Sequence, residues 1–77
     1  MTQERWKKDF SNNLKYYLKE RGMTQEQLSK DSGVAKSQIS DYINAKTMPN
    51  LPAVLNISRT FGIKAGELID FGERVSR

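Results

Sequence analysis

Residues 24–46, TQEQLSKDSGVAKSQISDYINAK, are the stretch that decides the fold of this chain. Thr24 followed three residues later by Gln27 is the pattern of a capping box, in which each side chain satisfies a backbone N–H group left free at a helix start. A helix is therefore expected directly after Thr24, with Leu28 as its buried anchor. Gly33 is expected to end this helix, because a tight turn between crossed helices needs a positive φ that glycine adopts at little cost.

A second helix is predicted after this turn, over residues 36–44. When each residue is advanced by 100°, Ile39, Tyr42 and Ile43 fall on one side, while short polar residues fall on the other. A DNA major groove about 12 Å wide admits a helix whose outward side chains are small or polar enough to approach base edges. An ordinary amphipathic helix of a bundle has the same two faces. The cap, the turn glycine and the apolar triplet at these spacings favour a helix-turn-helix that lies in duplex DNA.

Further segments from about Leu14 to Asp70 belong to one recognisable pattern: 18–25 (LKERGMTQ), Leu28, 32–34 (SGV), 39–42 (ISDY), 44–46 (NAK), Pro49 and 61–63 (FGI). Together these segments resemble the lambda-repressor-like, or Cro/repressor-type (XRE), helix-turn-helix family. The resemblance implies an all-α fold, a compact bundle of five helices that binds DNA.

Four positions depart from the pattern of this family. Leu18 and Ile43 stand where many members carry an Arg and a Glu that form an ion pair. An apolar contact is expected in its place, and the fold should be preserved because a partly buried ion pair often gains little over a hydrophobic pair. Ala45 stands where the family usually has Gly, which costs roughly 1 kcal/mol if the residue is left-handed. Ala35 replaces the commoner Ser or Thr cap, a loss of typically about 1 kcal/mol.

The whole chain of 77 residues is predicted to form a single domain, residues 1–77, with the motif at about 24–46 and a tail at about 71–77. A first helix is expected over residues 3–21, because apolar residues recur there at helical spacing, and these residues are expected to lie in the core: Trp6, Phe10, Leu14, Tyr17 and Leu18. Asn50 is expected to cap a fourth helix with Pro52 in its first turn and Gly62 at its end. The buried residues of this helix are expected to be Val54, Leu55, Ile57 and Phe61. Residues 65–70 are read as a short fifth helix.

The chain carries 13 Lys and Arg against 9 Asp and Glu, a net charge of +4. Six basic and three acidic residues lie in 1–21, whereas 22–46 holds three of each, so the basic surface is mainly the first helix. No His or Cys is present, and no Gly-rich phosphate loop or carboxylate pair of acid/base spacing is seen. The chain is therefore not expected to be an enzyme, and neither a metal, a cofactor nor a small-molecule ligand is predicted.

By resemblance, base readout falls on Lys36 and Ser37 at the start of the second motif helix and on Ser40 and Asp41 one helical turn later. Gln38 lies at the edge of the polar face and is added to this group for a backbone or flanking contact. Lys36 can donate to guanine O6 and N7, and Ser37 can donate or accept. Asp41 either accepts from cytosine N4 or orients a neighbouring Lys or Gln, and the sequence leaves both roles open. Phosphate contacts are expected from the start of the first motif helix, from the residues after the second and from the basic first helix: Thr24, Gln25, Asn44, Lys46, Thr47, Lys7 and Lys8.

A homodimer on a two-fold DNA operator is expected, because two such helices about 34 Å apart address successive major-groove turns. The predicted interface is the apolar C-terminal part, Leu68, Ile69, Phe71 and Val75. The predicted function is a sequence-specific transcriptional regulator, by resemblance a small phage or prophage-type Cro/repressor-like protein. Two alternatives stay open: a protein-interaction module such as an antitoxin-like subunit, and the N-terminal DNA-binding piece of a longer repressor.

The first 25 residues are charged and contain no apolar run of 7 to 15 residues. Neither a secretory signal nor a membrane span is therefore predicted, and a cytoplasmic protein close to the chromosome is expected.

Overall fold

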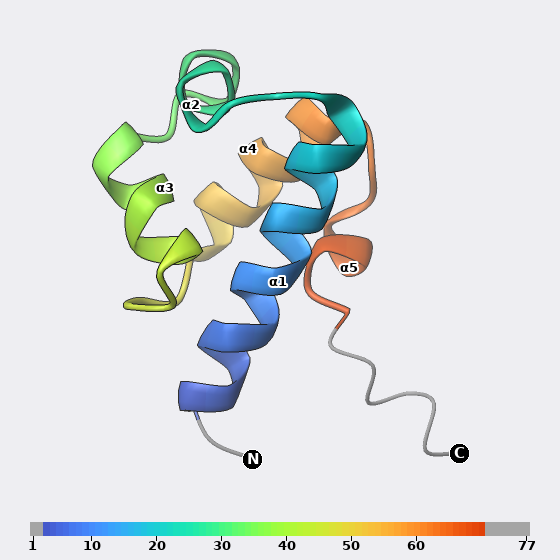
Figure 1. Cartoon of the computed structure of the whole chain (residues 1–77). Helices are drawn as coiled ribbons and strands as arrows, with labels where there is room; N and C mark the ends of the chain where they lie inside the picture. The colour runs from blue at the N-terminus through green and yellow to red at the C-terminus, as the bar shows by residue number, and fades with distance from the viewer. Residues whose placement is uncertain (1–2, 71–77) are drawn as a thin grey trace.

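The computed structural model describes residues 3–70, which form five helices and no strand (Figure 1). The helices are α1 (Gln3–Arg21), α2 (Gln25–Ser32), α3 (Lys36–Ile43), α4 (Leu51–Phe61) and α5 (Ala65–Leu68). The long α1 runs through the centre of the view, with α3 on one side of it, α5 on the other and α2 above them (Figure 1). The predicted all-α fold of five helices is confirmed.

Local signals set the helix starts that matter for the motif. The Thr24 hydroxyl accepts the Gln27 N–H at 3.1 Å, and the Thr24 N–H donates to Gln27 Oε1 at 3.0 Å, which closes the predicted capping box. Asn50 Oδ1 accepts the Ala53 N–H at 2.9 Å and caps α4. Gly33 ends α2 at a φ of 77°, in the left-handed region. These boundaries are confirmed because each depends on residues close together in the chain.

Two helix ends lie earlier than expected. Asn44 is the C-cap of α3 rather than its last residue. The fifth helix stops at Leu68 rather than at Asp70. Asn13 on α1 explains this second difference: its Nδ2 donates to the carbonyl oxygens of Leu68 at 2.8 Å and Asp70 at 2.9 Å, so the chain turns toward α1 instead of continuing the helix.

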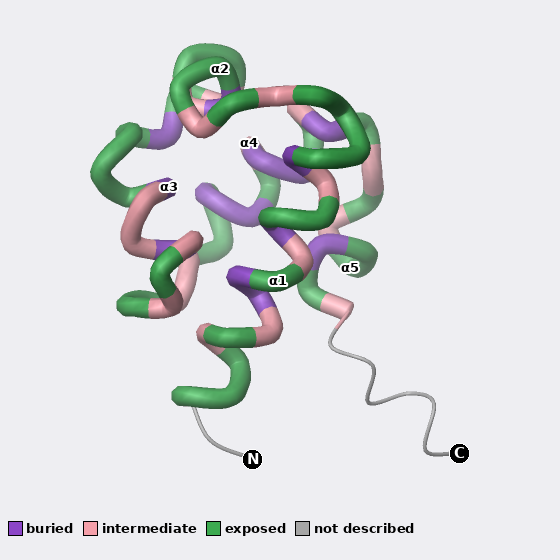
Figure 2. The backbone as a smooth tube through the Cα atoms, viewed as in Figure 1, coloured by how far each residue is buried: buried purple, intermediate pink, exposed green. Residues whose placement is uncertain are grey.

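One apolar core joins all five helices (Figure 2). Its buried residues are Phe10, Leu14, Leu18, Leu28, Val34, Ile39, Tyr42, Ala53, Val54, Ile57, Phe61 and Leu68. The rings of Phe10 and Tyr42 meet edge to face with centroids 5.6 Å apart, which fixes α3 against α1. The prediction of Trp6 and Leu55 as core residues is wrong, since they are 37% and 38% exposed. Helical spacing gives the direction of a side chain but not whether another element covers it.

Side chains of α1 also hold the ends of two other helices. The Ser11 hydroxyl donates to the carbonyl oxygen of Ile43, the last residue of α3. The Arg21 guanidinium donates to the carbonyl oxygen of Phe61 from Nε at 3.0 Å and from Nη2 at 2.8 Å, at the end of α4. These bonds satisfy carbonyl groups that a helix end leaves without a partner. They therefore position α3 and α4 through α1.

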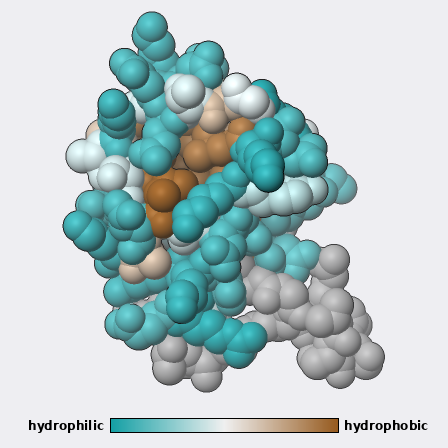
Figure 3. Space-filling model, in the orientation of Figure 1, coloured by the Kyte–Doolittle hydropathy of each residue, from teal (hydrophilic) through white to brown (hydrophobic). Residues whose placement is uncertain are grey.

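The face shown in Figure 3 is mostly hydrophilic, apart from an apolar patch in the hollow between α1, α2 and α3. Within residues 3–70, no helix is long and apolar enough to cross a membrane. The same part of the chain holds no group of three or more His, Cys, Asp or Glu residues suited to a metal ion.

Candidate nucleic-acid interface

The turn between α2 and α3 is fixed by hydrogen bonds between residues close together in the chain. Val34 fills the corner between the helices and is only 6% exposed. The Ser29 hydroxyl donates to the Val34 carbonyl oxygen at 2.7 Å, and the Val34 N–H donates to the Ser32 hydroxyl at 3.2 Å. The Gly33 N–H donates to the Ser29 carbonyl oxygen at 2.9 Å. The angle between the two helices is therefore set by local contacts, and so is the direction in which α3 projects.

The predicted two faces of α3 are present. Ile39 and Tyr42 are 0% and 2% exposed and anchor the helix in the core. Lys36, Ser37 and Gln38 are exposed on the first turn. We call these three residues the outer strip of α3.

Ser40 and Asp41, one turn further on, are partly buried. The Asn44 side-chain amide lies 3.4 Å from the Ser40 hydroxyl. Burial raises the pKa of the adjacent Tyr42 hydroxyl, and the negative charge of Asp41 adds to the rise. The five residues predicted to read bases thus divide into an exposed strip and two more enclosed members.

Both alanines that depart from the family pattern have the expected local effect. Ala35 makes no side-chain cap hydrogen bond at the start of α3. Ala45 has a φ of 58° and is the non-glycine residue with a positive φ in the described part of the chain. The turn around it is closed by hydrogen bonds from the Ala45 N–H to Tyr42 O at 3.1 Å and from the Lys46 N–H to Asp41 O at 2.8 Å. The usual left-handed turn is kept although Ala occupies it.

The residues predicted to contact phosphate lie before and after α3 in the chain. Thr24 is exposed and Gln25 partly buried at the start of α2. Asn44, Lys46 and Thr47 are exposed in the turn after α3. At the start of α2, the Thr24 side chain is already engaged within the protein, because its hydroxyl accepts the Gln27 N–H.

The first turns of α1 lie beside the turn that follows α3. Lys8 and Arg5 line one surface hollow with Ala45, and Glu4 completes it. Lys8 is exposed, whereas Lys7 is partly buried. Of the two lysines predicted on α1, Lys8 is thus the one that the structure brings to the turn after α3. The sequence could not separate the two, because it does not show which face of α1 packs beside the turn after α3.

The two apolar residues that stand in place of the family's ion pair both belong to the core region. Leu18 is 8% exposed, and Ile43 is partly buried against the same cluster. The exchange of charges for apolar side chains is therefore accommodated between α1 and α3.

Of the four residues predicted to form the dimer interface, the structure describes two, and these two differ in burial. Leu68 is 0% exposed and belongs to the core of one copy, so it offers no surface to a partner and its assignment is corrected. The α5 helix turns this side chain into the core cluster instead of toward solvent. Ile69 is 46% exposed. Phe71 and Val75 lie outside the described residues.

Comparison with known proteins supports the helix-turn-helix arrangement of α2 and α3. The helix-turn-helix family HTH_3 matches residues 14–68. An uncharacterised HTH-type transcriptional regulator of Methanocaldococcus jannaschii is 35% identical over 57 residues, which cover 74% of this chain and 86% of that protein. The crystal structure of an HTH_3 family transcriptional regulator from Vibrio cholerae has the same fold, with a TM-score of 0.86 at 18% identity over 96% of this chain. This chain spans only 42% of the length of that regulator. The chain therefore belongs to the HTH_3 helix-turn-helix family, a family of DNA-binding transcriptional regulators.

Proposed function

We propose that this protein is a sequence-specific regulator of transcription that reads duplex DNA with α3. The observation that carries the proposal is the contrast between the two faces of this helix. Ile39 and Tyr42 are buried in the core, whereas the outer strip is exposed at the end of α3 that follows the motif turn. A helix with its inner face buried in the core and its outer face exposed can enter a major groove without disturbing the domain.

Base readout is assigned to the outer strip first. The Lys36 ammonium donates to guanine O6 and N7, and the Ser37 hydroxyl donates or accepts. Gln38 lies at the edge of the strip and serves a flanking contact. Ser40 and Asp41 contribute one turn later, where Asp41 accepts from cytosine N4 or orients a neighbouring donor.

Phosphate contacts on both sides of the groove position the strip. Thr24 and Gln25 lie at the N-terminus of α2, where free N–H groups and the helix dipole favour an anion. Asn44, Lys46 and Thr47 serve the opposite side of the groove, together with Lys8 and, less directly, Lys7. These contacts raise affinity for any sequence and carry no base information.

The regulator is proposed to act as a homodimer on a two-fold operator, in the manner of small phage or prophage-type Cro/repressor-like proteins. Two copies of α3 about 34 Å apart reach successive turns of the major groove on one side of the duplex. The proposed working compartment is the cytoplasm, where the chromosome is the partner. Ile69, Phe71 and Val75 are proposed to contribute to the contact between copies.

Selection of bound fragments from random duplex DNA tests the function, because it reports binding, symmetry and half-site spacing together. The expected result is an enriched inverted repeat with half-sites about 10 base pairs apart. Recovery of unenriched sequence, with no protected duplex in footprinting, would refute the proposal and favour a protein-interaction module.

The strip itself is tested by replacing Lys36 and Ser37 together by Ala. The variant is expected to keep its helical circular dichroism but to bind operator and random duplex with nearly equal affinity, since phosphate contacts remain. Lys30→Ala on α2 removes the same charge from an exposed position outside the proposed contacts and serves as the control. Unchanged discrimination in the double variant would reject the assignment of the strip.

A further inference from the structure

The hydroxyl of Ser11 makes a hydrogen bond between α1 and the end of α3. Ser11 is 3% exposed, and among residues 3–70 it shares this degree of burial, for a polar side chain, with Ser58. Its hydroxyl donates to the carbonyl oxygen of Ile43, the last residue of α3, which lies 32 residues later in the chain. A hydroxyl at such a depth needs a partner, because an unpaired one is costly to bury. Ser11 therefore ties the middle of α1 to the C-terminal end of the proposed reading helix.

The last four carbonyl groups of α3 are satisfied in two different ways. Such groups have no partner within their own helix. Three of them accept N–H groups of the turn that follows: Ser40 O from Asn44 at 2.9 Å, Tyr42 O from Ala45 at 3.1 Å and Asp41 O from Lys46 at 2.8 Å. The fourth, Ile43 O, accepts the Ser11 hydroxyl. The end of α3 is thus closed partly from within the motif and partly from α1.

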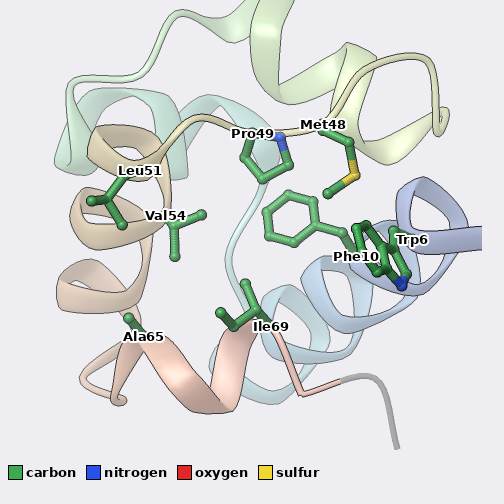
Figure 4. A pocket seen from close by; sticks show the side chains of 8 residues that line it. All are labelled: Trp6, Phe10, Met48, Pro49, Leu51, Val54, Ala65 and Ile69. Atoms are coloured by element: carbon green, nitrogen blue, oxygen red, sulfur yellow. The ribbon is translucent and has the colours of Figure 1, made fainter. Parts of the chain in front are cut away.

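The part of α1 that carries Ser11 is itself firmly held. The preceding residue, Phe10, is 0% exposed and meets the ring of Tyr42 edge to face. Figure 4 shows the Phe10 ring between Trp6 of α1 and Val54 of α4. Two successive residues of α1 thus contact α3 at two points. Packing of the rings sets how closely the helices approach, whereas the hydrogen bond of Ser11 adds a directional restraint on the last peptide group of α3.

We infer that Ser11 is a positioning residue for DNA readout, which holds the end of α3 in the orientation that lets the outer strip and the phosphate contacts engage one duplex together. This inference rests on the proposed function. Ser11 is buried and acts through Ile43, which is followed directly by the turn that carries Asn44, Lys46 and Thr47.

The position of this hydrogen bond makes readout more sensitive to its loss than affinity in general. Without the bond, the end of α3 is free to shift against α1, and the outer strip tilts relative to the phosphate contacts at the start of α2. Hydrogen bonds to base edges weaken steeply with poor direction. Contacts from long, flexible side chains to phosphate tolerate such a tilt and carry no base information. Loss of the Ser11 hydroxyl should therefore reduce discrimination between sequences first.

Lys8, three residues before Ser11, extends the same contact toward the DNA side of the proposal. It lines a surface hollow with Ala45, the residue at the centre of the turn after α3. Residues three apart on a helix lie on neighbouring parts of one face. The Ser11 bond thus also sets the spacing between the Lys8 ammonium and this turn.

Ser58 provides a matched control for Ser11. It is also 3% exposed, and its hydroxyl donates to the carbonyl oxygen of Leu55 at 3.0 Å, within α4 itself. Ser11→Ala and Ser58→Ala each remove one buried hydroxyl, and both variants are expected to unfold at lower urea concentration than the wild type. Only the first variant breaks a bond between two helices.

The experiment compares dissociation constants of the full chain for the operator recovered by selection and for a random duplex of equal length, at one salt concentration. Ser11→Ala is expected to raise the operator Kd about fivefold or more, the effect of one mismatched base pair. The Kd for random duplex should change less than about twofold in the same variant, and Ser58→Ala should keep the ratio of the two constants within about twofold of the wild type. A purely structural role would lower the folded fraction, raise both constants by one factor and leave their ratio unchanged.

A measurement without DNA follows the turn directly. In Ser11→Ala, the N–H groups of Ala45 and Lys46 should exchange with solvent at least about threefold faster relative to the Leu28 N–H of α2, because the turn they close has lost its support. Ser58→Ala should leave this relative rate unchanged. Ser11→Thr keeps a hydroxyl and is expected to restore both the relative exchange rate and the ratio of dissociation constants.

The outcomes separate this inference from the proposed function. A wild type that prefers no duplex sequence removes the proposed function and the inference with it. A wild type that discriminates, with equal discrimination by Ser11→Ala and Ser58→Ala, overturns the inference alone. A folded Ser11→Thr variant that discriminates as poorly as Ser11→Ala contradicts the role of the hydroxyl.

Discussion

At the scale of single residues, Ala45 has a strained backbone, as its place in the turn after α3 predicts. Its φ of 58° is a conformation that glycine adopts freely and that costs other residues about 1 to 2 kcal/mol. We expect Ala45→Gly to raise the free energy of unfolding by up to about 1 kcal/mol, since the greater entropy of unfolded glycine offsets part of the gain. Urea unfolding measures this change. Ala53→Gly, inside α4, should have the opposite sign.

Tyr42 makes stability depend on pH in the alkaline range. Burial raises the pKa of its hydroxyl above 10.0, and Asp41 adds to the rise. Because the unfolded chain loses this proton first, the stabilisation is fully present below pH 10 and is lost as the pH rises through the folded pKa. Tyr42→Phe should therefore lose less stability than the wild type between about pH 8 and about pH 11. Urea unfolding of both proteins at a series of pH values measures the two profiles.

At the scale of elements, α1 and α3 carry apolar side chains at Leu18 and Ile43, where the family resemblance leads us to expect an ion pair. We expect Leu18→Arg and Ile43→Glu each to destabilise the fold by about 2 kcal/mol or more, since each leaves a charge in or beside the core. The double variant should cost less than the sum, with a coupling of at least about 0.5 kcal/mol. Thermal and urea unfolding of the four proteins give the cycle. Strictly additive costs would show that the two side chains do not interact.

The elements also show which parts of the structure are visible in the sequence. The capping box at Thr24, the cap at Asn50 and the left-handed Gly33 were predicted correctly, because their hydrogen bonds join residues at most four apart. The bonds of Asn13 and Arg21 to distant carbonyl groups were not predicted, because they join residues 40 to 57 apart and depend on how whole helices pack. Helical spacing alone likewise placed Trp6 in the core.

The same limit applies to the candidate site. The outer strip was predicted from residue spacing within α3 together with the family resemblance, and its exposure agrees with that prediction. The surface hollow that joins Lys8 to Ala45 could not be found this way, because it brings together α1 and a turn 37 residues later. An apolar cleft lined by Trp6, Met48 and Ile69 was missed for the same reason (Figure 4).

At the scale of the whole molecule, the net charge of +4 predicts a salt-dependent affinity for any duplex DNA. Lys8→Ala should weaken binding to operator and random sequence alike and reduce the slope of log affinity against log salt by about 1. Lys7→Ala should change the slope less, because Lys7 is partly buried. Fluorescence anisotropy over a salt series measures both, with Lys64→Ala as the control on α5's side of the molecule. A loss confined to one operator base would contradict this role.

The exposure of Lys36, Ser37 and Gln38 has a consequence for how such proteins diversify. Substitutions at these positions leave the buried anchors of α3 untouched, so each new combination of side chains is presented by an equally stable domain. Descendants of one ancestral gene can thereby acquire different DNA targets through a few point mutations, because each variant along the way still folds.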